Sequence, residues 1–253
     1  MPRVAVLVPF AFDDEGLAKR RAQAESVQWG PGMSFDFVPV KAGPMLYEGP
    51  HDWMLADIAA FEVGRRVAPD YDALVIDTMS DSGVEALRCA VDIPVIGPAR
   101  ACYHLALTLG SRFGVLTQWA PWEAIYRKNM AAYGVAHQCA GIRHIDTPPD
   151  VKYLLGGKEE VVFPKLVAQG MRLVEDGADV VILGSTTMHE AHTHLVEHLP
   201  VPVLNPGPVS YKVCEAVLGL GLSQSRRSYP APLVPKYGMV EAMMDAAVAH
   251  EAG

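Results

Sequence analysis

The chain carries the same sequence pattern twice, once in each half. The first copy runs from Asp72 to Thr78 (DALVIDT) and the second from Asp179 to Ser185 (DVVILGS). Each copy leads through a helix-like segment to another short apolar run, at 93–98 and at 201–206. A solenoid needs at least three short repeats, so two long copies indicate two similar lobes related by a pseudo-twofold axis.

Short apolar runs alternate with longer amphipathic segments along the whole chain, which is typical of parallel sheets covered on both faces. Strands are predicted at 3–9, 35–40, 73–77, 93–97, 112–117, 142–145, 179–184 and 201–205. Helices are predicted at 14–29, 52–67, 83–91, 99–110, 121–133, 158–176, 187–199, 207–220 and 238–249. The order predicts an α/β protein of two pseudo-symmetric, flavodoxin-like lobes, each a four-stranded parallel sheet covered by helices.

The predicted domain division follows the repeat. Residues 1–110 form the N-terminal α/β lobe and residues 111–205 form the second lobe. Residues 206–253 form a C-terminal helix and tail that pack on the first lobe or on a neighbouring subunit.

Composition narrows the classes of function. The 253 residues have a formal charge of −8 with scattered Lys and Arg, which does not favour nucleic acid as a partner. No apolar run reaches membrane-spanning length, so no membrane partner is expected. The N-terminal apolar run is followed directly by Asp13, Asp14 and Glu15, which does not resemble a signal peptide. Four cysteines without close spacing favour a reduced, cytoplasmic setting.

Candidate ligand-binding residues follow four of the predicted strands. Ligands of doubly wound sheets bind at the carboxyl ends of the strands, where helix N-termini offer free N–H groups. Thr78 and Ser185 stand at equivalent points of the two copies and are expected to face a shared cleft that suits a small carboxylate. The other candidate binding residues are Pro9, Phe10, Met79, Ser80, Gln118, Trp119, Thr186 and Thr187.

Some of these residues also have a purely structural interpretation. The segments 82–85 and 187–190 fit the capping box that begins a helix, so hydroxyl-rich turns are expected here without a ligand. Four aromatic residues near the strand ends could line the cleft or pack between the lobes: Phe10, Phe12, Trp119 and Trp122.

The segment 187–199 also contains four histidines. Helical geometry puts His194 and His198 with Glu190 and Glu197 on a polar face that is expected to face solvent, so no metal site is predicted. His189 differs, because it lies in the first turn after Ser185.

The repeated segments resemble the aspartate/glutamate/hydantoin racemase superfamily. The resemblance rests on 72–88, 92–98, 112–117 and 181–188, and it extends from Met1 to about Leu220. It is strongest to the hydantoin and allantoin racemase branch. It implies two facing lobes and a reaction without metal or cofactor, in which one cysteine per lobe removes and returns a proton next to a carbonyl. It also implies a homo-oligomer.

Thr78 and Ser185 occupy the positions that match those two cysteines. A thiol has a pKa of about 8.5 and becomes a thiolate readily at a helix N-terminus, whereas an alkyl hydroxyl does not ionise near neutral pH. Ordinary two-thiol racemisation is therefore not expected. Related arylmalonate decarboxylases and maleate isomerases imply that the anion-binding site supports more than one reaction.

Three interpretations stay open for a small carboxylate or hydantoin-like cyclic amide. Ser185 could be a nucleophile with His189 as its base in a hydrolase or lyase. Asp77 or Asp81 could be a general base for isomerisation or elimination. The lobes could also bind a small acid without transforming it.

Overall fold

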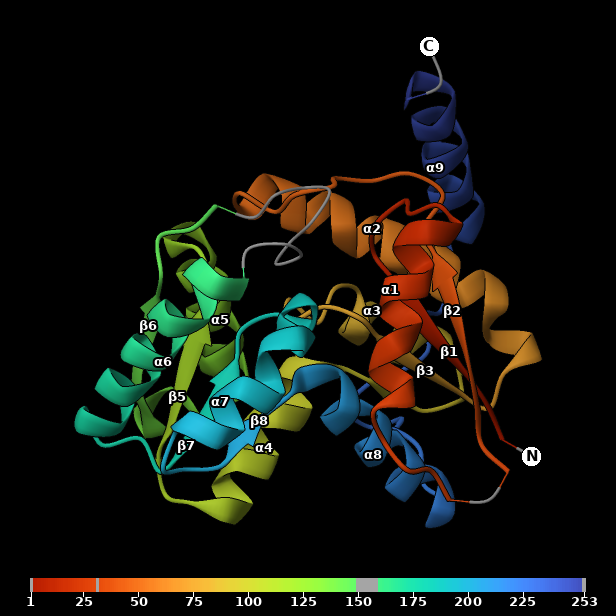
Figure 1. The fold of residues 1–253 in the computed structure, drawn as a ribbon. Coiled ribbons are helices and arrows are strands. Elements are labelled where there is room, and N and C mark those ends of the chain that lie inside the picture. Colours follow the sequence, from red (N-terminus) through yellow and green to blue (C-terminus); the bar gives the residue numbers. More distant parts are fainter. Residues whose placement is uncertain (1, 31, 149–158, 252–253) are drawn as a thin grey trace.

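The computed structural model describes residues 2–30, 32–148 and 159–251 and arranges them in two α/β lobes (Figure 1). The first sheet contains β1 (Arg3–Val8), β2 (Ser34–Pro39), β3 (Ala73–Ile76) and β4 (Val95–Ile96), in the order β2-β1-β3-β4. The second contains β5 (Phe113–Thr117), β6 (Cys139–His144), β7 (Val180–Leu183) and β8 (Val203–Leu204), in the equivalent order β6-β5-β7-β8. The strand pairs in both described sheets are parallel, which confirms the predicted fold class.

The helices also lie close to their predicted positions. They are α1 (Asp14–Glu25), α2 (Pro50–Val67), α3 (Val84–Ala90), α4 (Pro98–Leu109), α5 (Glu123–Ala132), α6 (Glu159–Glu175), α7 (His192–His198), α8 (Pro206–Gly219) and α9 (Tyr237–Glu251). Four short 3₁₀ helices join them: η1 (Ala68–Asp70), η2 (Ala120–Trp122), η3 (Ala136–Gln138) and η4 (Thr186–Ala191). The predicted first residue of α6, at position 158, lies outside the described residues.

The helix predicted over 187–199 is divided into two parts. Its first part is η4, whose cap is Ser185, and only its second part, α7, is α-helical. The Ser185 hydroxyl accepts a hydrogen bond from the Thr187 N–H, which begins the tighter 3₁₀ turn immediately after β7.

The repeated aspartates of the sequence have matching structural roles. Asp72 Oδ2 accepts a hydrogen bond from the Arg3 N–H at 2.8 Å, and Asp179 Oδ2 accepts one from the Arg112 N–H at 3.0 Å. Each carboxylate thus ties the start of its third strand to the start of the neighbouring first strand. The repetition therefore reflects the same contact formed in both lobes.

Both faces of each sheet are covered, as the apolar runs require. On β1, Ala5 and Leu7 face one core while Val4, Val6 and Val8 face another. Because successive side chains of a strand point to opposite faces, one continuous apolar run supplies both cores.

Two helices cross between the lobes. Helix α4 follows β4 of the first lobe but packs against β5 and β7, where Tyr103 stacks on Phe113. Helix α8 follows β8 of the second lobe but packs against β3 and β4, with Tyr211 buried in the first lobe. Each sheet is therefore covered in part by a helix that continues from the other sheet.

The C-terminal part of the chain returns to the first lobe. The Gln224 side chain donates to the carbonyls of Val91 and Ile93, and the Tyr229 hydroxyl accepts hydrogen bonds from Arg88 and Arg100. Helix α9 packs on α2 and extends away from the body of the molecule (Figure 1). Within the described ranges, no helix is both long and apolar enough to cross a membrane.

Candidate active site

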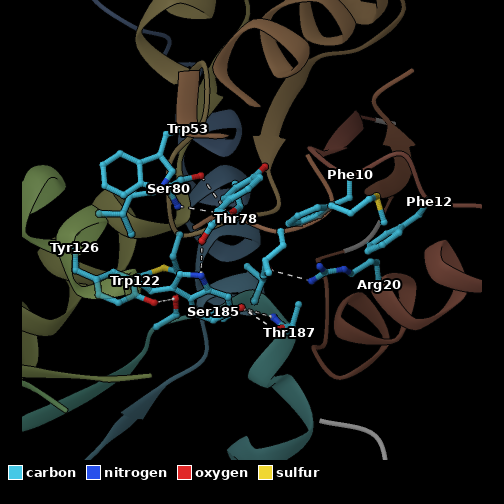
Figure 2. A pocket seen from close by; sticks show the side chains of 17 residues that line it. Phe10, Phe12, Arg20, Trp53, Thr78, Ser80, Trp122, Tyr126, Ser185 and Thr187 are labelled. Atoms are coloured by element: carbon cyan, nitrogen blue, oxygen red, sulfur yellow. Dashed lines mark hydrogen bonds between the residues drawn. The ribbon is translucent and has the colours of Figure 1, made fainter. Parts of the chain in front are cut away.

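A pocket lies between the lobes at the carboxyl ends of β3 and β7. Figure 2 shows Thr78 and Ser185 between two groups of labelled side chains, with Phe10, Phe12 and Arg20 on one side and Trp53, Trp122 and Tyr126 on the other. The full lining is Phe10, Phe12, Arg20, Met45, Leu46, Tyr47, Trp53, Thr78, Met79, Ser80, Trp122, Ile125, Tyr126, Gly184, Ser185, Thr186 and Thr187. Both repeated hydroxyl positions therefore reach the same pocket.

Hydroxyl groups surround Thr78. The Ser80 hydroxyl donates to Thr78 Oγ1 at 3.2 Å, and Ser80 and Ser82 share a hydrogen bond of 2.6 Å. The second lobe helps to hold this turn, because Asn129 of α5 donates to the Met79 carbonyl at 3.0 Å. The Thr78 side of the pocket is thus a buried network of neutral hydroxyls fixed by both lobes.

Ser185 has a similar environment. Its hydroxyl shares a hydrogen bond of 2.7 Å with Thr187 and accepts one from the Thr187 N–H at 3.2 Å. The preceding residue is Gly184, whose carbonyl accepts a hydrogen bond of 2.6 Å from Tyr126. A side chain at position 184 would collide with Tyr126 and Thr117, so glycine permits the close approach of α5 to the end of β7.

An apolar wall faces the hydroxyls. Phe10 stacks on Phe12 and on Tyr47, and the Trp122 indole N–H donates to the Tyr47 carbonyl at 2.8 Å. That hydrogen bond holds the segment before α2 against the second lobe. The pocket can therefore accept an apolar group beside its hydroxyls.

Sequence reasoning missed several residues of this wall. Met45, Leu46 and Tyr47 lie between β2 and α2, Trp53 lies in α2, and Ile125 and Tyr126 lie in α5. None of them follows a strand directly, which was the criterion for candidates. The aromatic side chains of Tyr47 and Trp53 were the signal in the sequence that could have indicated a pocket wall.

Three predicted binding residues do not belong to the lining. The Pro9 carbonyl accepts a hydrogen bond from the Tyr47 hydroxyl, and the Gln118 carbonyl accepts hydrogen bonds from the N–H groups of Ile145 and Thr147. The Trp119 ring packs edge-on against Trp122. These residues support the lining from behind, while Phe10, Met79, Ser80, Thr186 and Thr187 contribute to it.

Asp81 also lies outside the lining and caps a helix. Its carboxylate accepts hydrogen bonds from the N–H groups of Ala99 and Arg100, in the first turn of α4, and from the hydroxyl of Tyr133, which directly follows α5. Burial raises the pKa of Asp81 to about 6. The capping box expected over 82–85 does not form, because Gly83 precedes α3 and donates its N–H to Asp57.

His189 is not in contact with the pocket either. Its Nδ1 is hydrogen-bonded to the Asn205 amide at 2.9 Å, whereas the Ser185 hydroxyl is hydrogen-bonded to the hydroxyl and the N–H of Thr187. Burial lowers the pKa of His189. The structure thus does not pair this histidine with Ser185 in the way that the four-residue spacing suggested.

The ionisable groups of the lining are one arginine and two tyrosines. Arg20 of α1 lies beside Asp77, with Nε 3.5 Å from Oδ2, and both side chains are buried. Burial raises the pKa of both Tyr47 and Tyr126 far above neutrality. Among the described lining residues, no side chain is therefore an anionic base near neutral pH.

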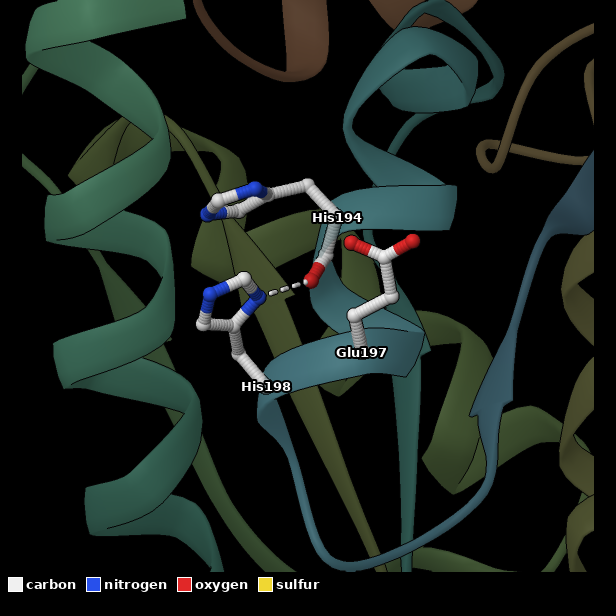
Figure 3. Close-up of side chains that lie close together, drawn as sticks. All are labelled: His194, Glu197 and His198. Carbon is white, nitrogen blue, oxygen red and sulfur yellow. Dashed lines mark hydrogen bonds between the residues drawn. The ribbon is translucent and has the colours of Figure 1, made fainter.

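A separate cluster on α7 contains His194, Glu197 and His198 (Figure 3), whose potential metal ligands lie within 4.8 Å of one another. His198 Nδ1 donates to the His194 carbonyl at 2.7 Å, and Glu197 and His198 are exposed. The solvent-facing prediction is confirmed for these two side chains, and none of the three lines the pocket.

The sequence model of the Asp/Glu/hydantoin racemase family matches residues 18–214, which cover most of the chain and both sides of the pocket. The chain belongs to this family. A hydantoin racemase of Rhizobium meliloti is 30% identical over 184 residues, which cover 72% of this chain and 73% of that protein. The resemblance to the hydantoin and allantoin branch is thereby confirmed.

Solved structures agree with the assignment of this racemase-family protein. An allantoin racemase from Klebsiella pneumoniae superposes with a TM-score of 0.83 at 28% identity, covering 95% of this chain and 99% of that one. The allantoin racemase of Pseudomonas fluorescens gives a TM-score of 0.81 at 24% identity, covering 92% and 98%. The two-lobed arrangement is thus the arrangement of the family.

Proposed function

We propose that this protein is a cofactor-independent enzyme that acts next to a carbonyl group of a small carboxylate or hydantoin-like cyclic amide. The observation that carries the proposal is the meeting of Thr78 and Ser185, from equivalent strand ends of the two lobes, in one pocket. Membership of the racemase family supports an isomerase-type reaction at this position.

The two hydroxyls have a different role from a pair of thiols. We place Thr78 and Ser185 at the positions where the family has its proton-transferring cysteines. An alkyl hydroxyl is not a base near neutral pH, so these groups donate hydrogen bonds to a carbonyl or carboxylate oxygen. Such donors stabilise the enolate that forms when the neighbouring carbon loses a substituent.

The wall defines the rest of the ligand. Phe10, Tyr47, Trp53 and Trp122 surround the space beside the hydroxyls, so an aromatic or branched apolar group on the reacting carbon fits the pocket. A hydrolase that uses Ser185 as nucleophile and His189 as its base has less support, because the His189 ring is hydrogen-bonded to Asn205.

One observation favours a second reaction. Removing a proton from carbon needs a base, and no described lining side chain is anionic near neutral pH. Decarboxylation needs none: the bond to the carboxylate carbon breaks, carbon dioxide leaves, and the electron pair stays on the substrate as an enolate that takes a proton from solvent. A malonate-type acid is therefore the alternative substrate.

Mass spectrometry in deuterated buffer distinguishes the reactions. A panel of hydantoins, lactams, cyclic imides and substituted malonates is incubated with the protein and with a Thr78→Val/Ser185→Ala control. Deuterium uptake at the reacting carbon without other change identifies isomerase chemistry, and loss of carbon dioxide identifies the decarboxylase. A gain of water would identify a hydrolase and contradict both proposals. Both proposals would also be contradicted if no compound of the panel changed in mass.

A further inference from the structure

Arg20 is the one cationic side chain among the described residues that line the pocket. It extends from α1 beneath Phe10 and Phe12, with its guanidinium carbon 5.6 Å and 5.5 Å from the two ring centroids. Figure 2 shows it on the side of the pocket formed by these rings. Only 4% of the residue is exposed.

The partners of Arg20 flank both hydroxyl positions. Its Nη1 donates to the Thr186 hydroxyl at 3.1 Å, and its Nε lies near the carboxylate of Asp77. Asp77 immediately precedes Thr78, and Thr186 immediately follows Ser185. The Thr186 hydroxyl in turn donates to the Asp77 carbonyl at 3.1 Å. The guanidinium therefore joins the ends of β3 and β7 next to the proposed reaction centre.

The hydrogen-bonding capacity of this guanidinium is not filled. Nη2 is buried and has no hydrogen-bond partner in the described part of the chain. The contact with Asp77 is a single ion pair at 3.5 Å, longer than a charge-assisted hydrogen bond. Burial raises the pKa of the Asp77 carboxyl, and Arg20 opposes that rise. Leaving a charged donor unpaired in an apolar site is costly, which points to a ligand group.

We propose that Arg20 binds a carboxylate of the substrate, so that the natural ligand is an anion with an apolar group. A guanidinium presents parallel N–H groups that fit a carboxylate, whereas a neutral amide or imide uses them less well. The inference rests on the proposed function, because it concerns the same pocket. It narrows the substrate class from carboxylate or cyclic amide to carboxylate.

Matched ligands test this without requiring turnover. Phenylacetate and phenylacetamide share their ring and size and differ in charge. Calorimetric titration at neutral pH should give an affinity about 10- to 100-fold higher for the acid, as expected for charged hydrogen bonds. The acid should also raise the melting temperature more than the amide.

The variants must separate binding from folding. Arg20→Gln alone would leave Asp77 buried without its partner, so the main variant is Arg20→Gln/Asp77→Asn, which removes both charges together. Its preference for the acid should vanish while its circular dichroism spectrum stays native. Arg20→Lys should keep part of the preference, and Arg21→Gln, at an exposed position of the same helix, should keep all of it.

Equal binding of acid and amide, binding of neither, or a preference that survives in the folded double variant would each overturn the inference. Turnover of neutral hydantoins with no preference for the acid would overturn it while leaving the proposed function standing. Acid-selective binding, with no compound of the panel transformed, would overturn the proposed function while leaving the inference about Arg20 standing.

Discussion

A methyl group at position 184 would meet the hydroxyl of Tyr126 at 2.6 Å and the Thr117 Cβ at 2.8 Å. Gly184→Ala should therefore lower the free energy of unfolding by about 1–3 kcal/mol, the usual cost of overpacking. Urea titration measures the change. Gly219→Ala, where a new Cβ would have no neighbour within 4 Å, is the control and should not destabilise the protein. An unchanged unfolding midpoint in Gly184→Ala would contradict the close packing beside Ser185.

The hydroxyl of Thr78 can be removed with little change of shape. Thr78→Val should lower kcat/KM for the substrate found in the panel by about 10- to 100-fold, because a donor to a developing negative charge is lost. The control is Thr108→Val, which removes an exposed threonine hydroxyl from α4. Equal activity of the two variants would argue against a role for Thr78 in the reaction.

At the scale of elements, the first turn of α4 depends on Asp81, which holds it to the turn after β3. Burial raises the pKa of Asp81 from 3.8 to about 6 in the folded protein. The folded state therefore binds this proton more tightly than the unfolded state. The stabilisation of the fold by this bound proton is fully present below the pKa that Asp81 has in the unfolded state. It is lost as pH rises through the pKa that Asp81 has in the folded state.

This sign gives a measurable pH dependence. Between about pH 4.5 and pH 7, Asp81 should reduce the free energy of unfolding by about 2 kcal/mol. Asp81→Asn should lack this contribution, so the difference between wild type and variant should change with pH by that amount in urea titrations. A difference that is constant across the range would mean that Asp81 does not titrate there.

The helices and strands can be predicted from the local sequence, whereas the residues of the pocket wall cannot. Continuous apolar runs and helical periodicity predicted the strands and helices, and the repeat predicted that Thr78 and Ser185 would meet. Tyr47 and Trp53 line the pocket from the segment before α2 and from α2 itself, and Trp122 of the other lobe donates a hydrogen bond to the Tyr47 carbonyl. Asp81 was taken for a possible base, but its left-handed backbone, with φ of 52°, directs it to α4. Such long-range contacts leave no periodic signal in the sequence.

At the scale of the whole molecule, the exchange of α4 and α8 couples the two lobes. Each sheet would lose a covering helix if the other unfolded, so we expect one cooperative transition in calorimetry, with equal calorimetric and van't Hoff enthalpies. Tyr103→Ala, in the contact of α4 with the second sheet, should destabilise that whole transition by about 3–5 kcal/mol. Two resolved transitions would show that the lobes are independent.

We propose that Thr78 and Ser185 occupy the two proton-transfer positions of a racemase-family pocket. Placing thiols there, in Thr78→Cys/Ser185→Cys, tests it most directly. The N-terminus of η4, which directly follows Ser185, should favour a thiolate at that position. The variant is incubated with one enantiomer of an aromatic hydantoin, and racemisation is measured as the loss of optical rotation.

The double variant should racemise this hydantoin at least about 100-fold faster than either single-cysteine variant, in the range that a positioned acid and base contribute. Racemisation no faster than in the single variants, from a double variant that is folded and binds the hydantoin, would contradict the assignment of these two positions.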